Sequence, residues 1–104
     1  MTDYIVTYDL TNSTPSPYGT MLDEAEKLGW SRWIWGPTNK KWLRLPNTTL
    51  IGEFATQADA KKAFDDAVAA TAREIGRKVT VEKFILAAYG GATYNSDEKV
   101  DGST

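Results

Sequence analysis

Hydrophobic and polar residues alternate along several parts of the chain, and a period of two is typical of strands. The clearest case is Tyr4–Leu10, which is also rich in β-branched and aromatic residues. Residues 41–45 and 48–54 also have strand character and flank a Pro-Asn turn, so we expect a hairpin there. A fourth strand is predicted over residues 79–89, where both faces are apolar.

Two other segments carry apolar residues at helical spacing. The first covers residues 17–28 and is followed by Gly29, in the position where a helix commonly ends. The second covers residues 56–75, and Thr56 with Asp59 forms a capping-box pattern at its start. These signals predict two helices, one between the first and second strands and one between the third and fourth.

The predicted order is strand, helix, strand, strand, helix, strand. This order favours an α+β, ferredoxin-like β-α-β-β-α-β sandwich, in which a four-stranded antiparallel sheet has two helices on one face. We expect one domain over residues 1–90 and a polar, mobile C-terminal tail over residues 91–104. Residues 31–35 fit either a helical extension or a short strand, and residues 92–94 fit a short edge strand.

The open face of this sheet favours an oligomer. In the first strand, Ile5, Thr7 and Asp9 are expected to lie on the open face, away from the helices. The last strand is apolar on both faces, and such a sheet commonly buries its open face against a partner. We therefore expect a two-fold homodimer. The larger apolar set of the first strand is expected beneath the helices: Tyr4, Val6, Tyr8 and Leu10.

The amino-acid composition limits the kinds of active site that this protein can form. The 104 residues include no cysteine and no histidine. This excludes disulfides, thiol catalysis, Ser-His-Asp triads and iron–sulfur clusters, and we expect neither zinc nor haem. Carboxylates, hydroxyls, lysines and arginines remain. A chain of this length is too small for a deep pocket, so we expect an active site to need two copies.

The chain carries no sign of a membrane or secretory segment. Its first residues show neither a basic region nor an apolar run. The longest apolar run, Phe84–Tyr89, has six residues, whereas a membrane-spanning helix needs about 20. We therefore expect a cytoplasmic protein without membrane association.

Charge is unevenly distributed, although the net charge is only −2. Residues 29–52 contain four bases, no acid and all four tryptophans. Aromatic side chains stack on nucleic-acid bases, and cations pair with phosphates. We therefore predict RNA or DNA as a partner. An alternative is that the tryptophans fill the core or a dimer interface, with the bases at the rim. The predicted contact residues are Arg32, Trp33, Trp35, Lys40, Lys41 and Arg44.

Residues 3–89 carry a pattern shared with a known family. A strand reading YIVTYDL ends in an aspartate, and the first helix ends in Leu-Gly. The segment LPNTTLIG, a helix beginning TQAD and an apolar strand follow. The chain thereby resembles the small CRISPR-associated Cas-two superfamily, which includes virulence-associated protein D, a ribonuclease toxin, and stand-alone bacterial relatives. Residues 30–40 look like an insertion relative to that pattern.

The resemblance implies a homodimer of ferredoxin-like subunits. In members that cut RNA or DNA, it also implies that Asp9 of each subunit holds a divalent metal between the subunits. Mg²⁺ or Mn²⁺ suits such a site, because Mg²⁺ takes oxygen ligands and a bound metal activates water without histidine. Asp9 is thus the candidate catalytic residue and metal ligand. As an alternative, its side chain only shapes the turn after the strand.

These observations lead to one expectation and two alternatives for function. We expect a dimeric nucleic-acid-associated protein, and metal-dependent endonuclease activity at Asp9 is left open. The first alternative is a non-catalytic ferredoxin-like dimer that serves as a protein-interaction or scaffold module. The second is a small-ligand binder that uses the tryptophans as an apolar pocket between sheets.

Overall fold

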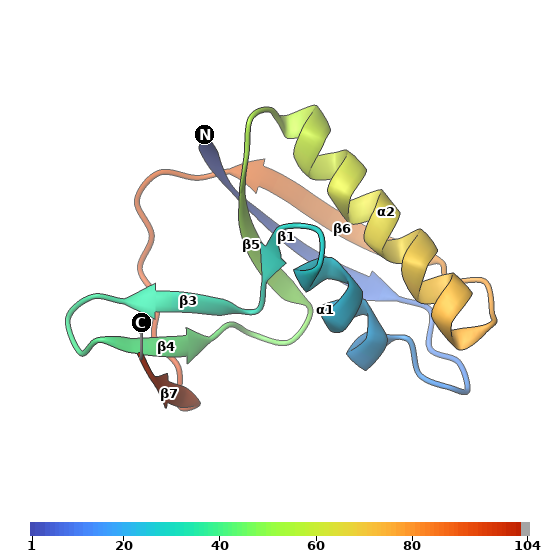
Figure 1. Ribbon diagram of the computed structural model, residues 1–104, viewed down its shortest axis with the longest axis horizontal. Helices are drawn as coiled ribbons and strands as arrows, with labels where there is room; N and C mark the ends of the chain where they lie inside the picture. The colour runs from blue at the N-terminus through green and yellow to red at the C-terminus, as the bar shows by residue number, and fades with distance from the viewer. Residues whose placement is uncertain (103–104) are drawn as a thin grey trace.

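The computed structural model describes residues 1–102 and divides them between two sheets and two helices. Both helices lie together against the larger sheet, while the smaller sheet projects from one end (Figure 1). No helix of the described residues is long and apolar enough to cross a membrane. The elements are β1 (Thr2–Leu10), α1 (Tyr18–Glu26), β2 (Trp30–Ser31), β3 (Trp33–Gly36), β4 (Lys41–Arg44), β5 (Thr49–Phe54), α2 (Gln57–Ile75), β6 (Val81–Ala88) and β7 (Lys99–Asp101).

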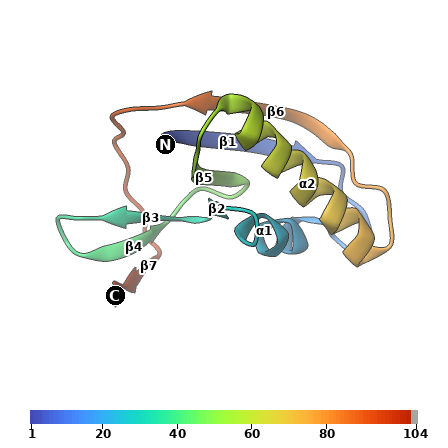
Figure 2. The same ribbon diagram turned by 45° about the horizontal axis from the view of Figure 1, so that its top comes forward.

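The larger sheet has the strand order β2-β5-β1-β6, and every neighbouring pair is antiparallel. β1 lies inside the sheet, where Val6 is opposite Leu50 of β5 on one side and Leu86 of β6 on the other. Figure 2 shows the two helices on the same side of this curved sheet. β6 and the very short β2 are therefore its two edge strands.

The core lies between this sheet and the helices. The face of β1 that was expected beneath the helices is buried there, with Val6 fully buried. Tyr8 of β1 packs against Phe64 of α2 at a ring-centroid distance of 5.5 Å. Met21 of α1 is also fully buried. The alternating apolar residues of β1 and the regularly spaced apolar residues of the two helices thus pack into one core cluster.

The expected ferredoxin-like arrangement around one sheet is wrong, because β3, β4 and β7 form a second antiparallel sheet in the order β3-β4-β7. The expected hairpin of residues 41–45 with 48–54 is also wrong. β4 pairs with β3 and β7, whereas β5 pairs with β1 and β2. The physical reason is local: β3 and β4 are joined by a four-residue turn, so their pairing closes a very short loop.

The signals at the ends of α2 are confirmed. Thr56 accepts a hydrogen bond on its side-chain oxygen from the backbone amide of Asp59 at 3.1 Å. At the other end Gly76 adopts the left-handed conformation, with φ of +69°. The N-cap residue of α1 is Pro17, which has no side-chain acceptor, and the hydroxyl of Ser16 accepts only a long hydrogen bond, at 3.4 Å, from the amide of Tyr18.

Part of the segment expected to be a mobile tail pairs with the smaller sheet. In β7, Val100 lies opposite Trp42 of β4. Gly102 then approaches the ring of Trp35 so closely that a side chain at this position would overlap it. The last residues of the predicted tail, 103 and 104, lie outside the described residues.

Candidate functional site

The β3–β4 hairpin has one aromatic and one aliphatic side. Trp35 lies opposite Trp42, and Trp33 lies opposite Arg44. Because successive side chains of a strand point to opposite faces, these four residues share one side of the hairpin. We call the side that carries Trp33, Trp35 and Trp42 the aromatic face. Leu43 belongs to the other side, where it is 5% exposed.

Contacts hold two of the three tryptophans of the aromatic face, Trp35 and Trp42. The rings of Trp35 and Trp42 meet edge to face, with their centroids 5.0 Å apart. The hydroxyl of Tyr94 donates a hydrogen bond to the carbonyl oxygen of Trp35 at 2.8 Å. Trp42 remains 37% exposed, and its neighbour Val100 is 45% exposed. The face is therefore a held aromatic surface that solvent reaches.

The fourth tryptophan has a different place. Trp30 of β2 is 2% exposed and packs on Phe54, with 4.8 Å between the ring centroids. The interpretation that tryptophans fill the core is therefore confirmed for Trp30, whereas stacking of nucleic-acid bases on the other three tryptophans stays a prediction. Trp30 fills the core, and the other three tryptophans form the aromatic face.

Two of the four predicted basic contact residues are bound to carboxylates. Arg32 donates to both carboxylate oxygens of Glu26, at 2.9 and 3.0 Å, and to Asp23 at 2.8 Å. The hydrogen bonds to Glu26 raise the pKa of Arg32. Lys41 pairs with Asp101 at 2.7 Å, and this hydrogen bond lowers the pKa of Asp101. Little of either positive charge is left for an external anion.

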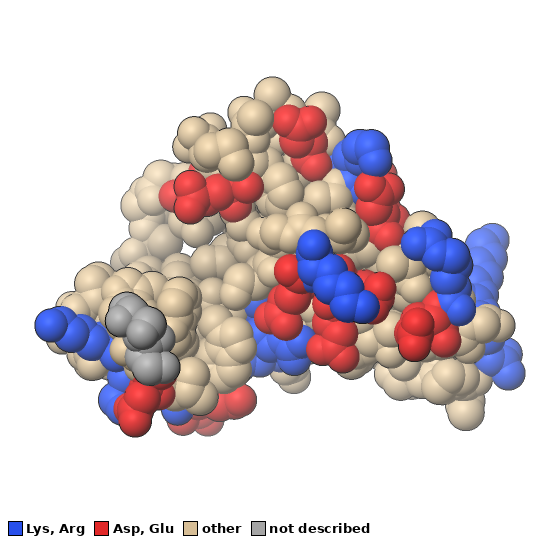
Figure 3. Space-filling view, viewed as in Figure 1, with Lys and Arg blue, Asp and Glu red and all other residues tan. Residues whose placement is uncertain are grey.

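The other two bases, Lys40 and Arg44, have no carboxylate within ion-pair distance in the part of the chain that the structure describes. Lys40 is exposed at the turn between β3 and β4, and Arg44 ends β4. On the side of the molecule shown in Figure 3, acidic and basic groups are interspersed and form no large basic patch. Electrostatic attraction of a polyanion is therefore modest on this side.

Asp9 lies one residue before the end of β1, with its side chain 51% exposed. It is in register with Lys83 of β6, whose Nζ is 3.7 Å from its Oδ2. Within residues 1–102, no three acidic residues are grouped closely enough to hold a metal ion. A metal shared with the carboxylate of a second copy stays a prediction.

Asp9 also lines a pocket of about 510 Å³ that the sequence did not predict. We call it the β1 pocket, because it lies between the end of β1, the start of α1 and the chain that follows β4. Its volume and residues depend on how these three segments pack together. The lining residues are Tyr8, Asp9, Tyr18, Gly19, Leu22, Arg44, Asn47 and Thr48.

Tyr8 is the most perturbed group of the β1 pocket. Its hydroxyl is buried and has no hydrogen-bond partner among the described residues. Burial raises the pKa of Tyr8 to about 12, and the positive charge of Arg44 acts against this rise. A neutral phenol with an unused proton, near a guanidinium group, is an arrangement that suits an anionic ligand.

A groove of about 550 Å³ runs between the two sheets. Ile5 and Ile51 of the larger sheet face Ile34 and Leu43 of the smaller sheet across it. The tryptophans do not line it, so it is not the tryptophan pocket of the small-ligand alternative. It shows instead that the aliphatic side of the hairpin is turned toward the larger sheet, which leaves the aromatic face outermost.

No family model, curated protein or solved structure matches the chain. The resemblance to the Cas-two superfamily therefore stays a prediction.

Proposed function

We propose that the protein binds single-stranded RNA or DNA on the aromatic face of the hairpin. The observation that carries this proposal is that Trp33, Trp35 and Trp42 share the side of the hairpin turned away from the larger sheet. Stacking of a base on an aromatic side chain contributes ~1–3 kcal/mol. Single strands are the matching partner, because their bases are available for stacking, whereas those of a duplex are already stacked.

The charges around the face support stacking as the main source of affinity. Arg44 lies on the aromatic face and Lys40 lies at its tip, and these are the bases without carboxylate partners there. Each phosphate contact of a single strand contributes a slope of about −0.7 to the dependence of affinity on salt. Two contacts give a slope of about −1.4, which is a weak salt dependence for a nucleic-acid-binding protein.

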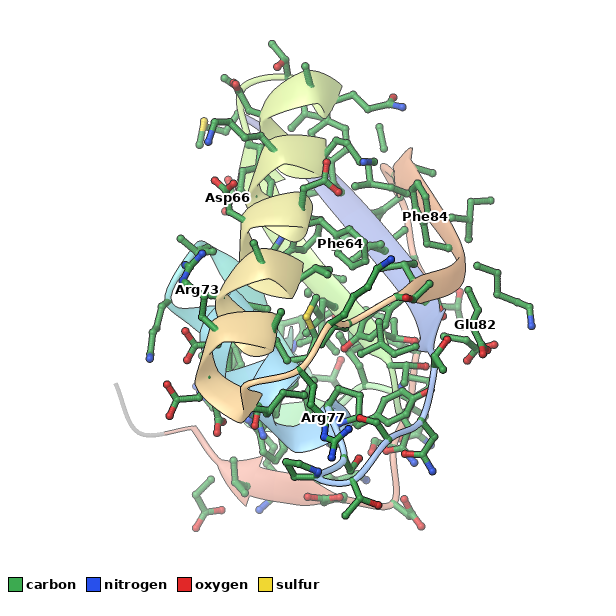
Figure 4. The ribbon with its side chains drawn as sticks, turned by 90° about the vertical axis from the view of Figure 1, so that its right-hand side faces the viewer. Phe64, Asp66, Arg73, Arg77, Glu82 and Phe84 are labelled. Atoms are coloured by element: carbon green, nitrogen blue, oxygen red, sulfur yellow. The ribbon has the colours of Figure 1, made fainter. Side chains whose placement is uncertain are left out.

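The homodimer belongs to the same proposal, but we place its interface at the outer edge of β6 rather than on the open face of the sheet, because Ile5 and Ile51 of that face lie against the smaller sheet. β6 is an edge strand of eight residues, and Ile85 is 65% and Phe84 46% exposed. Phe84 stacks on Phe64 of α2 at 5.7 Å, as Figure 4 shows from the side of this edge. A long apolar edge strand is a template for pairing. A two-fold axis pairs β6 with β6 of a second copy.

Quenching of tryptophan fluorescence by short oligo-dT and oligo-U tests the binding proposal. We expect saturable quenching, and we expect Trp42→Ala to raise Kd about tenfold through loss of one stacking partner. Leu28→Ala is the matched control, because it removes an apolar side chain of nearly equal exposure, 38% against 37% for Trp42, from a position outside the hairpin and β6. Absence of quenching, or equal losses in the two variants, contradicts the proposal.

A further inference from the structure

Arg44 gives the β1 pocket a cation with unused donors. Its guanidinium donates one hydrogen bond, from Nη1 to the carbonyl oxygen of Leu45 at 2.8 Å. No carboxylate of residues 1–102 lies within ion-pair distance of it. A guanidinium has five N–H donors in a planar fork that matches the oxygens of a phosphate or carboxylate. Several of these donors are available to an anion in the pocket.

Tyr8 adds a second donor that lacks a partner. The residue is 3% exposed, and its hydroxyl makes no hydrogen bond within the described part of the chain. A buried hydroxyl without a partner costs free energy, so a ligand that accepts its proton gains more than it would from an exposed hydroxyl. The positive charge of Arg44 acts on Tyr8, so an accepting oxygen there meets a cation that has no carboxylate partner among the described residues.

The start of α1 supplies a third favourable feature. Tyr18 and Gly19, the first residues of this nine-residue helix, line the pocket. The N-cap residue Pro17 offers no side-chain cap, and the first turn contains no acidic residue. The hydroxyl of Ser16 accepts one long hydrogen bond, at 3.4 Å, from the amide of Tyr18, so the partial positive charge of the helix start is only partly compensated. Asn47, on the opposite wall, adds an amide that can donate to an oxygen.

We infer that the β1 pocket binds a phosphate group, with Arg44 and Tyr8 as its main donors. The volume of about 510 Å³ exceeds that of phosphate alone, and Tyr18 and Leu22 provide an apolar wall for an attached group. A mononucleotide and a nucleic-acid strand both present this chemistry. Arg44 also lies on the aromatic face, but the test does not depend on stacking there, because inorganic phosphate suffices to occupy the donors of the pocket.

The negative charge of Asp9 repels an anion in this pocket, so substitution of Asp9 tests the phosphate inference. Asp9 is one of the residues that line the pocket, and the ion pair with Lys83 at 3.7 Å offsets only part of its charge. Removal of this charge by Asp9→Asn is therefore expected to tighten phosphate binding. If Asp9 instead holds a metal ion that binds the phosphate, Asp9→Asn is expected to weaken phosphate binding, because the variant would lose the metal.

The test is a titration of the full chain with inorganic phosphate, followed by the backbone amide NMR signals of Gly19, Asn47 and Thr48. We expect saturable shifts, about tenfold weaker binding in Arg44→Gln, and severalfold weaker binding in Tyr8→Phe with an unchanged or higher Tm. Arg73→Gln removes an equal charge from α2, outside the pocket, and is expected to bind normally.

Two further ligands identify the source of the phosphate. Tighter binding of a 5′-mononucleotide than of phosphate indicates a free nucleotide, whereas tighter binding of a 5′-phosphorylated oligonucleotide indicates a strand. Both results support the inference. It is overturned if phosphate causes no saturable shift of these amides, or if Arg73→Gln weakens binding as much as Arg44→Gln. Chemical shifts of the free variants show whether each one is folded.

Discussion

The hydroxyl of Tyr18 forms two hydrogen bonds with the backbone of Leu10. It donates to the carbonyl oxygen at 2.6 Å and accepts from the amide at 3.0 Å. These bonds tie the first residue of α1 to the last residue of β1, which are the two segments that flank the β1 pocket. A single side chain of α1 thus pairs with both backbone polar groups of the last residue of β1.

We expect Tyr18→Phe to lower the free energy of unfolding by about 1–3 kcal/mol, because the Leu10 backbone groups lose a buried partner. Urea denaturation measures this change. Tyr94→Phe is the matched control: it also removes a phenol that bonds a backbone carbonyl, but at an exposed position. The account is contradicted if the control destabilises the protein as much as Tyr18→Phe does.

Stability is expected to fall at high pH because of Tyr8. The folded-state pKa is raised to about 12 from the usual value of 10.0, so the folded protein keeps the proton that the unfolded chain loses above pH 10. The stabilisation is complete below pH 10 and is lost as pH rises to 12. A shift of this size corresponds to on the order of 3 kcal/mol.

Denaturation curves at pH 9 and at pH 12 check this expectation in the wild type and in Tyr8→Phe. The variant is expected to lose the largest part of the dependence on pH. It is also expected to be at least as stable as the wild type at pH 9, because it removes a buried hydroxyl that has no partner in the described residues. If Tyr8→Phe loses as much stability between pH 9 and pH 12 as the wild type does, groups other than Tyr8 cause the loss.

Salt dependence separates stacking from charge pairing. We expect the slope of log K against log salt concentration to be about −1.4 for a single strand and about −0.7 in Lys40→Gly. Glycine suits this position, because Lys40 has a φ of +54°. Lys62→Gln, on the exposed side of α2, is expected to leave the slope unchanged. A steep salt dependence of binding in the wild type, Lys40→Gly and Lys62→Gln would contradict stacking as the main source of affinity.

Substitution of Ile85 is expected to disrupt the homodimer. A lysine at this exposed position places like charges at the two-fold axis of paired β6 strands, so Ile85→Lys is expected to be monomeric in sedimentation equilibrium. Ile85→Val keeps an apolar strand-forming side chain and is expected to remain dimeric. A wild-type protein that is monomeric at high concentration would disprove the interface.

Local signals predicted some elements well. β1 and α2 follow from patterns that lie within the elements themselves, namely alternation in Tyr4–Leu10 and the capping pair Thr56 and Asp59. The second sheet could not be predicted in this way. Its strand β7 has only three residues, and its pairing with β4 joins segments nearly sixty positions apart. Nothing in the local pattern of Lys99–Asp101 specifies that pairing.

The candidate site shows the same division. The outward position of Asp9 on β1 follows from alternation alone, and so does the burial of Tyr8 on the opposite side. The β1 pocket does not follow from alternation, because it forms only where the chain after β4 passes the start of α1. The four tryptophans are close together in the sequence, but the fold buries Trp30 and leaves Trp42 exposed. The number of tryptophans in a segment does not show which of them are buried.

Photo-crosslinking tests the central claim most directly. Ultraviolet irradiation of the protein with oligo-U, followed by mass spectrometry, locates the residues that contact the bases. We expect the crosslinked nucleotide within residues 33–44, and we expect the crosslink to be reduced in Trp42→Ala but retained in Leu28→Ala. Crosslinks confined to other segments, or equal yields in the wild type and Trp42→Ala, would contradict binding at the aromatic face.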